Sequence, residues 1–122
     1  MSLRVIRDGT IDPWWSAAID HSLVDSVRLR GSNPILHIYR RPPTVSLGYF
    51  QPASAIDRPL AESKGIAVLR RMSGGGTIYN DEGQLIYTLV LHEKEVPSGS
   101  GAALTFTCGA VADAVCRLGG DA

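Results

Sequence analysis

Arg70-Arg71-Met72-Ser73-Gly74-Gly75-Gly76-Thr77-Ile78-Tyr79 is the most informative stretch of this sequence. Residues 66–71 before the glycines and residues 77–79 after the break have the composition of strands. Three consecutive glycines bring bare main chain to the surface, where N–H groups can reach an anion and a ligand can lie flat against the backbone. Arg71, at the mouth of the loop, can supply a fixed charge for phosphate or carboxylate. The alternative interpretation is a flexible glycine turn with solvated arginines.

This loop differs from the two common glycine-rich phosphate-binding motifs. No Gly-Lys-Ser/Thr follows it, as a P-loop requires. A strand rather than a helix comes next, which excludes the dinucleotide-binding fingerprint. The loop therefore predicts a turn between two strands.

A long helix is predicted at residues 12–30. Asp12 supplies an N-cap carboxylate, Pro13 occupies the first helical position and Gly31 can close the last turn. Four apolar residues recur every four positions and form the stripe that we expect to face the core: Trp15, Ile19, Leu23 and Val27.

Further strands are predicted at residues 35–40, 44–47 and 85–92, from apolar runs bounded by turn residues. A short helix begins after Asp57 and ends at Lys64-Gly65, and a final helix follows the loop at residues 97–101. The final helix carries an apolar stripe that needs a surface to cover: Leu104, Cys108, Val111, Val115 and Leu118. Hairpin-like successions of strands with separate helices predict an α+β domain, with helices packed on a mainly antiparallel or mixed sheet.

Composition restricts the class of protein. The chain has 122 residues, one domain by length, and its 44% of hydrophobic residues suffices for a core. Twelve Lys and Arg balance twelve Asp and Glu, with a pI of about 6.8, which argues against nucleic acid and anionic membranes as partners. No apolar run approaches the length of a membrane span, and charges interrupt the N-terminal hydrophobic residues. We therefore expect a cytoplasmic protein.

The cysteines and histidines do not suggest a site. Cys108 and Cys116, about 12 Å apart on one helix, are too distant for a mutual disulfide. Cys108 is expected in the core as a small hydrophobic residue rather than as a nucleophile. His21, His37 and His92 lack metal-ligand spacing and are expected to be surface or hydrogen-bonded histidines. The sequence predicts no metal site.

Three segments together resemble the lipoate–protein ligases in order and approximate spacing. They are Asp12-Pro13-Trp14-Trp15 with Ala18-Ile19-Asp20, Ser46-Leu47-Gly48-Tyr49-Phe50-Gln51, and the glycine segment continued through Asn80-Asp81. The glycine segment with its Arg-Arg pair is specific to this family and its octanoyltransferase relatives, whereas biotin ligases share the fold with a different arginine–glycine pattern. The resemblance implies a biotin/lipoyl ligase-like α+β fold, of which residues 1–122 are an N-terminal portion.

The resemblance also implies a binding site for ATP and lipoate, with Mg²⁺ accompanying the ATP. The implied ATP and lipoyl-AMP site consists of Arg71, Ser73, Gly74, Gly75, Gly76, Thr77, Ile78 and Tyr79, and the implied acyl-chain pocket of Gly48, Tyr49 and Phe50. For the aromatic residues the alternative is ordinary core packing. Two positions depart from the family in the contacts to the ligand: Asn80, where histidine is usual, and Ile86, near a position that is often small and polar.

The implied reaction has two steps. Lipoate and ATP form lipoyl-AMP, and the acyl group passes to a lysine of a lipoyl domain, in a 2-oxoacid dehydrogenase E2 or a glycine cleavage H protein. The family's adenylate-contacting lysine lies beyond the point corresponding to Ala122, and neither Lys64 nor Lys94 has a matching context. We therefore expect the chain alone to be inactive in adenylation, and to self-associate or join a complementary chain. Two alternatives stay open: an octanoyltransferase that uses acyl carrier protein without ATP, and a non-catalytic binding subunit that needs a second chain.

Overall fold

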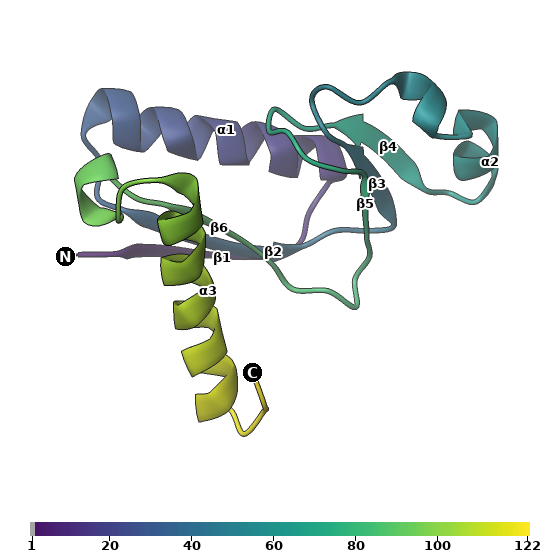
Figure 1. Cartoon of the computed structure of the whole chain (residues 1–122). Helices are drawn as coiled ribbons and strands as arrows, with labels where there is room; N and C mark the ends of the chain where they lie inside the picture. Colours follow the sequence, from purple (N-terminus) through teal and green to yellow (C-terminus); the bar gives the residue numbers. More distant parts are fainter. Residues whose placement is uncertain (1) are drawn as a thin grey trace. The chain divides into compact units, whose positions relative to one another are not determined.

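The computed structural model describes residues 2–122 and divides into two compact units, Met1–Val90 and Leu91–Ala122 (Figure 1). The predicted α+β class is confirmed. The first unit runs in the order β1 (Arg4–Thr10), α1 (Pro13–Arg30), β2 (Ile35–Arg40), β3 (Thr44–Leu47), α2 (Arg58–Ser63), β4 (Ala67–Arg70), β5 (Ile78–Asn80) and β6 (Ile86–Val90). The second unit contains α3 (Ser100–Arg117).

The strands of the first unit form two three-stranded mixed sheets, ordered β1-β2-β6 and β4-β3-β5. In each sheet the central strand has one parallel and one antiparallel neighbour. Although β2 and β3 are consecutive in the chain, they enter different sheets. Pro42-Pro43 separates the two strands, and proline has no N–H with which to continue a ladder.

Local signals in the sequence predict the strand ends well. β2 and β3 begin and end at the predicted residues: Pro34 precedes β2, Pro43 precedes β3, and Gly48 follows β3. β6 is shorter than the predicted span of 85–92, because a 3₁₀ turn at Glu93–Glu95 follows it with His92 as its N-cap. The expected strand at 77–79 is β5, shifted by one residue.

Helix α1 has the predicted caps. The Asp12 carboxylate accepts a hydrogen bond from the Trp15 N–H at 2.8 Å, and Gly31 adopts a left-handed conformation with φ of 63°. The predicted apolar stripe is wrong at its first position, since Trp15 is 62% exposed. Pro13, Ser16 and Val27 are the buried residues of the helix instead. The buried face of α1 therefore includes a polar residue, Ser16, whose hydroxyl accepts a hydrogen bond from Arg41, the residue after β2.

Helix α1 lies along the β1-β2-β6 sheet (Figure 1). Val27 of the helix, Ile35 of β2 and Val90 of β6 form a buried apolar cluster, against which Ile6 and Leu23 pack. This cluster lies near the C-terminal end of α1, and the opposite end of the same helix–sheet layer contains polar side chains. The apolar cluster packs α1 against the sheet at one end, and the polar side chains at the other end are available to line a cavity.

The second unit has no buried residue in α3. The expectation that Cys108 lies in a core is wrong, since both Cys108 and Cys116 are exposed. The apolar stripe predicted on this helix is exposed as well, from Val115 at 36% to Leu118 at 89%. None of the helices in residues 2–122 has the length and apolar content of a membrane span.

Candidate functional site

Arg71 folds the glycine loop against β3. Its Nη1 donates to the Ser46 carbonyl at 2.9 Å, and its Nη2 donates to the carbonyls of Gly74 and Gly76 at 2.7 Å each. A planar guanidinium with several fixed donors can hold three carbonyls in one geometry, which an ammonium group cannot do as well. The turn is therefore tied to Arg71, and the interpretation in which the arginines are simply solvated is wrong.

Arg70 performs the same role for the preceding loop. Its Nη1 lies within hydrogen-bond distance of the carbonyls of Gly48, Tyr49 and Gln51. The two hydrogens on that nitrogen serve at most two of these acceptors at a time. Successive residues of a strand point to opposite faces, so Arg70 and Arg71 organise different loops from one strand end.

The two loops are also bonded to each other. The Tyr49 N–H donates to the Ser73 carbonyl at 2.9 Å, and the Thr77 hydroxyl donates to the Gln51 side-chain oxygen at 2.7 Å. Gly48 packs against the main chain of Gly75 so closely that a Cβ on Gly48 would overlap the Gly75 carbonyl oxygen. Gly48 is therefore required by close approach of two main chains, and Gly75 by its φ of 90°.

The main-chain N–H groups of the glycine loop are unengaged. Within residues 2–122, the amides of Gly74, Gly75 and Gly76 donate no hydrogen bond, although the carbonyls of Gly74 and Gly76 are held by Arg71. Because Arg71 holds two carbonyls of the loop, the loop's conformation is constrained, and its free N–H groups remain available as donors. Such an arrangement suits an anion.

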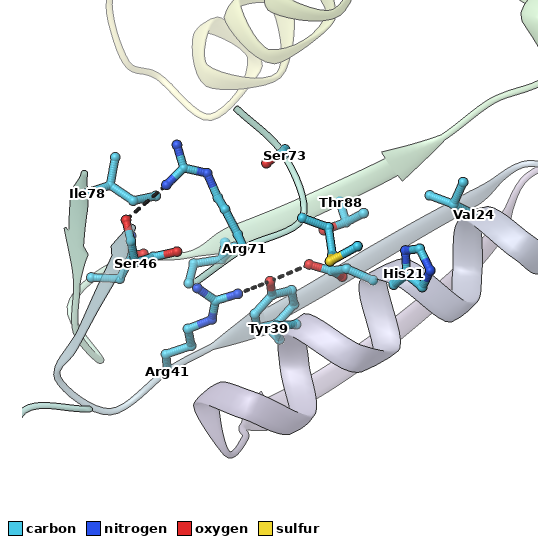
Figure 2. Close-up of a pocket in the computed structure, with 14 residues that line it drawn as sticks. His21, Val24, Tyr39, Arg41, Ser46, Arg71, Ser73, Ile78 and Thr88 are labelled. Carbon is cyan, nitrogen blue, oxygen red and sulfur yellow. Dashed lines mark hydrogen bonds between the residues drawn. The ribbon is translucent and has the colours of Figure 1, made fainter. Parts of the chain in front are cut away.

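A cavity of about 440 Å³ opens beside this loop (Figure 2). Its wall comes from α1, from β2 and the residue after it, from β3, from the start of the glycine segment, and from β5 and β6. The apolar part of the wall consists of Ala17, Val24, Met72, Ile78 and Ile86, and the polar part of Asp20, His21, Tyr39, Arg41, Ser46, Arg71, Ser73, Asn80 and Thr88.

The residues predicted for the site divide into three groups. Arg71, Ser73 and Ile78 line the cavity. Gly48, Gly74, Gly75, Gly76 and Thr77 build the two bonded loops beside it. Three predicted residues do not line this cavity: Tyr49, Phe50 and Tyr79. Phe50 is 86% exposed, and its ring packs edge-to-face on the Tyr49 ring with 5.0 Å between the ring centroids. Tyr79 follows Ile78 on β5, so the two side chains point to opposite faces of the strand.

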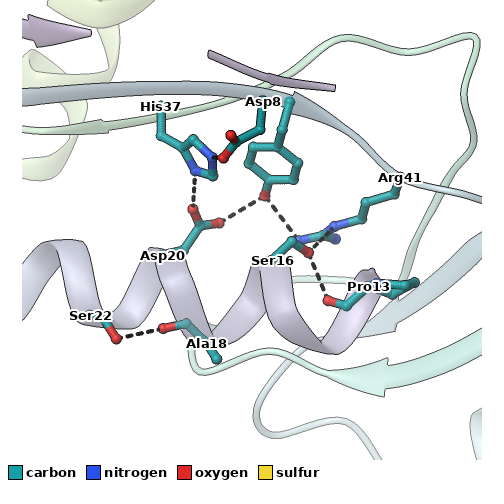
Figure 3. A network of polar contacts seen from close by, with 9 residues as sticks. Asp8, Pro13, Ser16, Ala18, Asp20, Ser22, His37 and Arg41 are labelled. Carbon is teal, nitrogen blue, oxygen red and sulfur yellow. Dashed lines mark hydrogen bonds and ion pairs between the residues drawn. The ribbon is translucent and has the colours of Figure 1, made fainter. Parts of the chain in front are cut away.

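A polar network extends from the cavity-wall residues Asp20 and Tyr39 to the buried His37 (Figure 3). The His37 ring is fully buried, with Nε2 at 2.9 Å from an Asp8 carboxylate oxygen and Nδ1 at 3.2 Å from Asp20. Each ring nitrogen of His37 therefore lies within hydrogen-bond distance of a different carboxylate. The expectation of a hydrogen-bonded His37 is confirmed.

Tyr39 connects this network to Arg41. Its hydroxyl donates to Asp20 at 2.8 Å and accepts from Arg41 Nη2 at 3.0 Å. Burial, followed by the Asp20 carboxylate, raises the pKa of Tyr39 to about 12, although the Arg41 guanidinium acts in the opposite direction. Tyr39 therefore remains a neutral donor throughout the physiological range.

Sequence reasoning missed most of the cavity wall. Asp20, Tyr39, Arg41 and Ser46 come from three separate parts of the chain, and no short motif relates them. One signal was available: Ser16 and Asp20, four residues apart, put two polar groups on one helical face beside Leu23 and Val27. Among residues 2–122 no group of three or more His, Cys, Asp or Glu side chains is arranged to hold a metal ion.

The sequence profile of the family described as "Lipoyl protein ligase A/B catalytic domain" matches residues 12–122. The chain belongs to this family. A curated relative, the octanoyltransferase LipM of Moorella thermoacetica, is 34% identical over 92 residues, which are 74% of this chain and 33% of the relative.

Solved structures of this family agree with the fold. A crystal structure of lipoate-protein ligase A bound with ATP superimposes with a TM-score of 0.81 at 26% identity, over 99% of this chain and 49% of that one. A bi-partite lipoate protein ligase from Thermoplasma acidophilum, studied with its E2 lipoyl domain, gives a TM-score of 0.69 at 27% identity, over 97% of this chain and 46% of that one. The lipoyl ligase-like chain thus spans about a third to a half of the relatives that it matches.

Proposed function

We propose that the cavity beside the glycine loop holds an activated lipoyl or octanoyl group, and that the chain is the acyl-activating part of a lipoate–protein ligase. The observation that carries this proposal is the position of the cavity: an apolar wall continues to a loop whose amides are free to bind an anion. An aliphatic acyl chain fits the first part, because each buried CH₂ contributes about 0.8 kcal/mol. A carboxylate or phosphate fits the second part.

In this proposal the two arginines are positioning residues for different loops. Arg71 holds the carbonyls of Gly74 and Gly76, so the amides between them face the reacting group. Two hydrogens, on Nε and Nη1, have no partner among residues 2–122, so Arg71 can also contact the ligand's carboxylate or phosphate directly. Preorganised donors of this kind stabilise charge that develops during acyl transfer.

The proposed reaction joins the lipoate carboxylate to the α-phosphorus of ATP with release of pyrophosphate. A lysine amine of a lipoyl domain, in a 2-oxoacid dehydrogenase E2 or a glycine cleavage H protein, then displaces AMP and forms the amide. The Mg²⁺ of this step would come with the ATP phosphates. The ATP-bound lipoate-protein ligase A and the bi-partite ligase among the similar structures support this assignment.

We also propose that adenylation needs polypeptide equivalent to the other half of these relatives, in the same or a second chain. The chain spans 49% of the ATP-bound ligase, and the bi-partite ligase is a precedent for division of such an enzyme. Lipoate-dependent exchange between ATP and pyrophosphate tests the proposal. We expect no exchange with residues 1–122 alone and exchange when the complementary polypeptide is added. Exchange by residues 1–122 alone would show that this part contains all the catalytic charge.

An octanoyltransferase is the second candidate, favoured by the 34% identity to the octanoyltransferase LipM. This reaction takes the octanoyl group from acyl carrier protein and needs no ATP. The distinguishing assay uses the complete protein with octanoyl-acyl carrier protein and an apo lipoyl domain. Transfer without ATP, combined with no ATP–pyrophosphate exchange, would assign the chain to the transferases and reject the ligase.

A further inference from the structure

Ser46 has a buried hydroxyl with no partner. The residue is 1% exposed, and its Oγ has no hydrogen-bond partner among residues 2–122. Ser46 pairs directly with Ile78 of β5, and directly opposed residues of an antiparallel pair point to the same face of a sheet. Ile78 and Ser46 both line the cavity, so the unpartnered hydroxyl is on the cavity side (Figure 2).

Arg41 is a second buried donor at the same wall. The residue is 7% exposed, and its guanidinium uses Nε for Ser16 and Nη2 for the Tyr39 hydroxyl. A guanidinium has five N–H groups, so three have no partner among residues 2–122. No carboxylate in that part of the chain forms an ion pair with Arg41, and its link to Asp20 runs only through Tyr39.

The other polar groups close to Arg41 are already occupied. The Tyr39 hydroxyl donates to Asp20 and accepts from Arg41, and the Ser16 hydroxyl donates to the Pro13 carbonyl and accepts from Arg41. An apolar ligand that displaces water from the cavity would leave the donors of Arg41 and Ser46 buried and unsatisfied, which is unfavourable. A ligand that brings an oxygen acceptor to them avoids this loss.

We propose that Arg41 and Ser46 form a polar subsite in the cavity that selects acyl chains carrying an oxygen acceptor over plain hydrocarbon chains. The inference rests on the proposed acyl-binding function and specifies its substrate class. The Arg41 guanidinium can only donate and the Ser46 hydroxyl can donate as well as accept, so a hydroxyl or carbonyl oxygen on the acyl chain is the group that both residues can bind.

The test compares octanoate with a series of hydroxyoctanoates substituted from C4 to C8, by calorimetry on the full chain. All these probes have the same carboxylate, so any difference reports the added oxygen. We expect at least one hydroxyoctanoate to bind about five- to a hundredfold more tightly than octanoate. Ser46→Ala and Arg41→Met should each reduce this preference, and Ser63→Ala, an exposed serine on α2, should leave it unchanged.

Ser46→Ala also protects the test against misfolding. It removes a hydroxyl that has no protein partner, so the melting temperature of the ligand-free chain should not fall. If octanoate binds as tightly as every hydroxyoctanoate, or if the preference survives both substitutions, the polar subsite is refuted while acyl binding stands. If neither octanoate nor any hydroxyoctanoate binds, the acyl-binding proposal fails and the subsite with it.

Discussion

Replacement of Gly48 by alanine is the sharpest test of the two-loop architecture. A Cβ at this position would overlap the Gly75 carbonyl oxygen, and would lie 3.0 Å from the Gly75 carbonyl carbon and 3.4 Å from Arg71 Nη2. The methyl group has no room to relax because the overlapping atoms are main chain. The glycine loop must therefore move away from β3, by on the order of 1 Å.

The magnitude follows from the contacts that such a shift disturbs. Overpacking of this kind costs about 1–3 kcal/mol. Displacement of Gly75 also stretches the hydrogen bonds from Arg71 to Gly74 and Gly76, each worth about 1 kcal/mol. For a chain of 122 residues, each kcal/mol lowers the melting temperature by about 3–6 °C. Misplacement of a binding loop by about 1 Å can reduce its function on the order of a hundredfold.

The assay measures thermal unfolding and the affinity for octanoyl sulfamoyl adenosine, a stable acyl-adenylate mimic. Gly9→Ala is the control outside the site, because a Cβ at Gly9 meets nothing within 4 Å and its φ is not positive. We expect Gly48→Ala to lower the melting temperature and weaken binding about ten- to a hundredfold, whereas Gly9→Ala stays within about 0.5 kcal/mol of the parent. Equal affinity of the two variants would refute the reasoning.

Three further predictions concern the same region. Gly75→Ala forces a φ of 90° on an L residue and places Cβ 3.1 Å from Arg71 Nη2. The free energy of unfolding in urea should therefore fall by about 1–2 kcal/mol, and an unchanged urea midpoint would contradict the strained turn. Arg71→Ala should weaken binding of the acyl-adenylate mimic about ten- to a hundredfold, because the glycine loop loses the donors that hold it; normal affinity with an intact circular dichroism spectrum would remove Arg71 from the site. The pKa of Tyr39 is raised from 10.0 to about 12, so the folded chain keeps a proton that the unfolded chain loses; stability is fully present below pH 10 and declines from there toward pH 12. Tyr39→Phe should lower stability by about 1–3 kcal/mol at pH 8, since Asp20 and Arg41 lose a partner, and should remove the Tyr39 contribution to the decline between pH 10 and pH 12; a decline of the same size in Tyr39→Phe would assign it to other groups.

The glycine loop shows how far sequence reasoning reaches into the site. The three glycines predicted bare main chain whose N–H groups can reach an anion, and within residues 2–122 the amides of these glycines have no hydrogen-bond acceptor. The close approach of Gly75 to Gly48 was not predicted. The sequence assigned the Arg71 charge to a ligand. In the structure three of its donors face carbonyls of its own chain. A side chain's partners depend on which loops are brought near it, and Ser46 is 25 residues away in the chain.

What the sequence alone determined is the set of local elements. Capping by Asp12 and Gly31, the prolines around β2 and β3, and the glycines between β4 and β5 act over a few residues, so they can be read without knowledge of the fold. Tertiary structure alone decided which face of α1 is buried, why His37 lies between Asp8 and Asp20, and how six segments form one cavity. The physical reason is that burial of a polar group is stable only when its hydrogen-bond partners are present. Those partners lie on strands that are distant in sequence, and only sheet pairing brings them together.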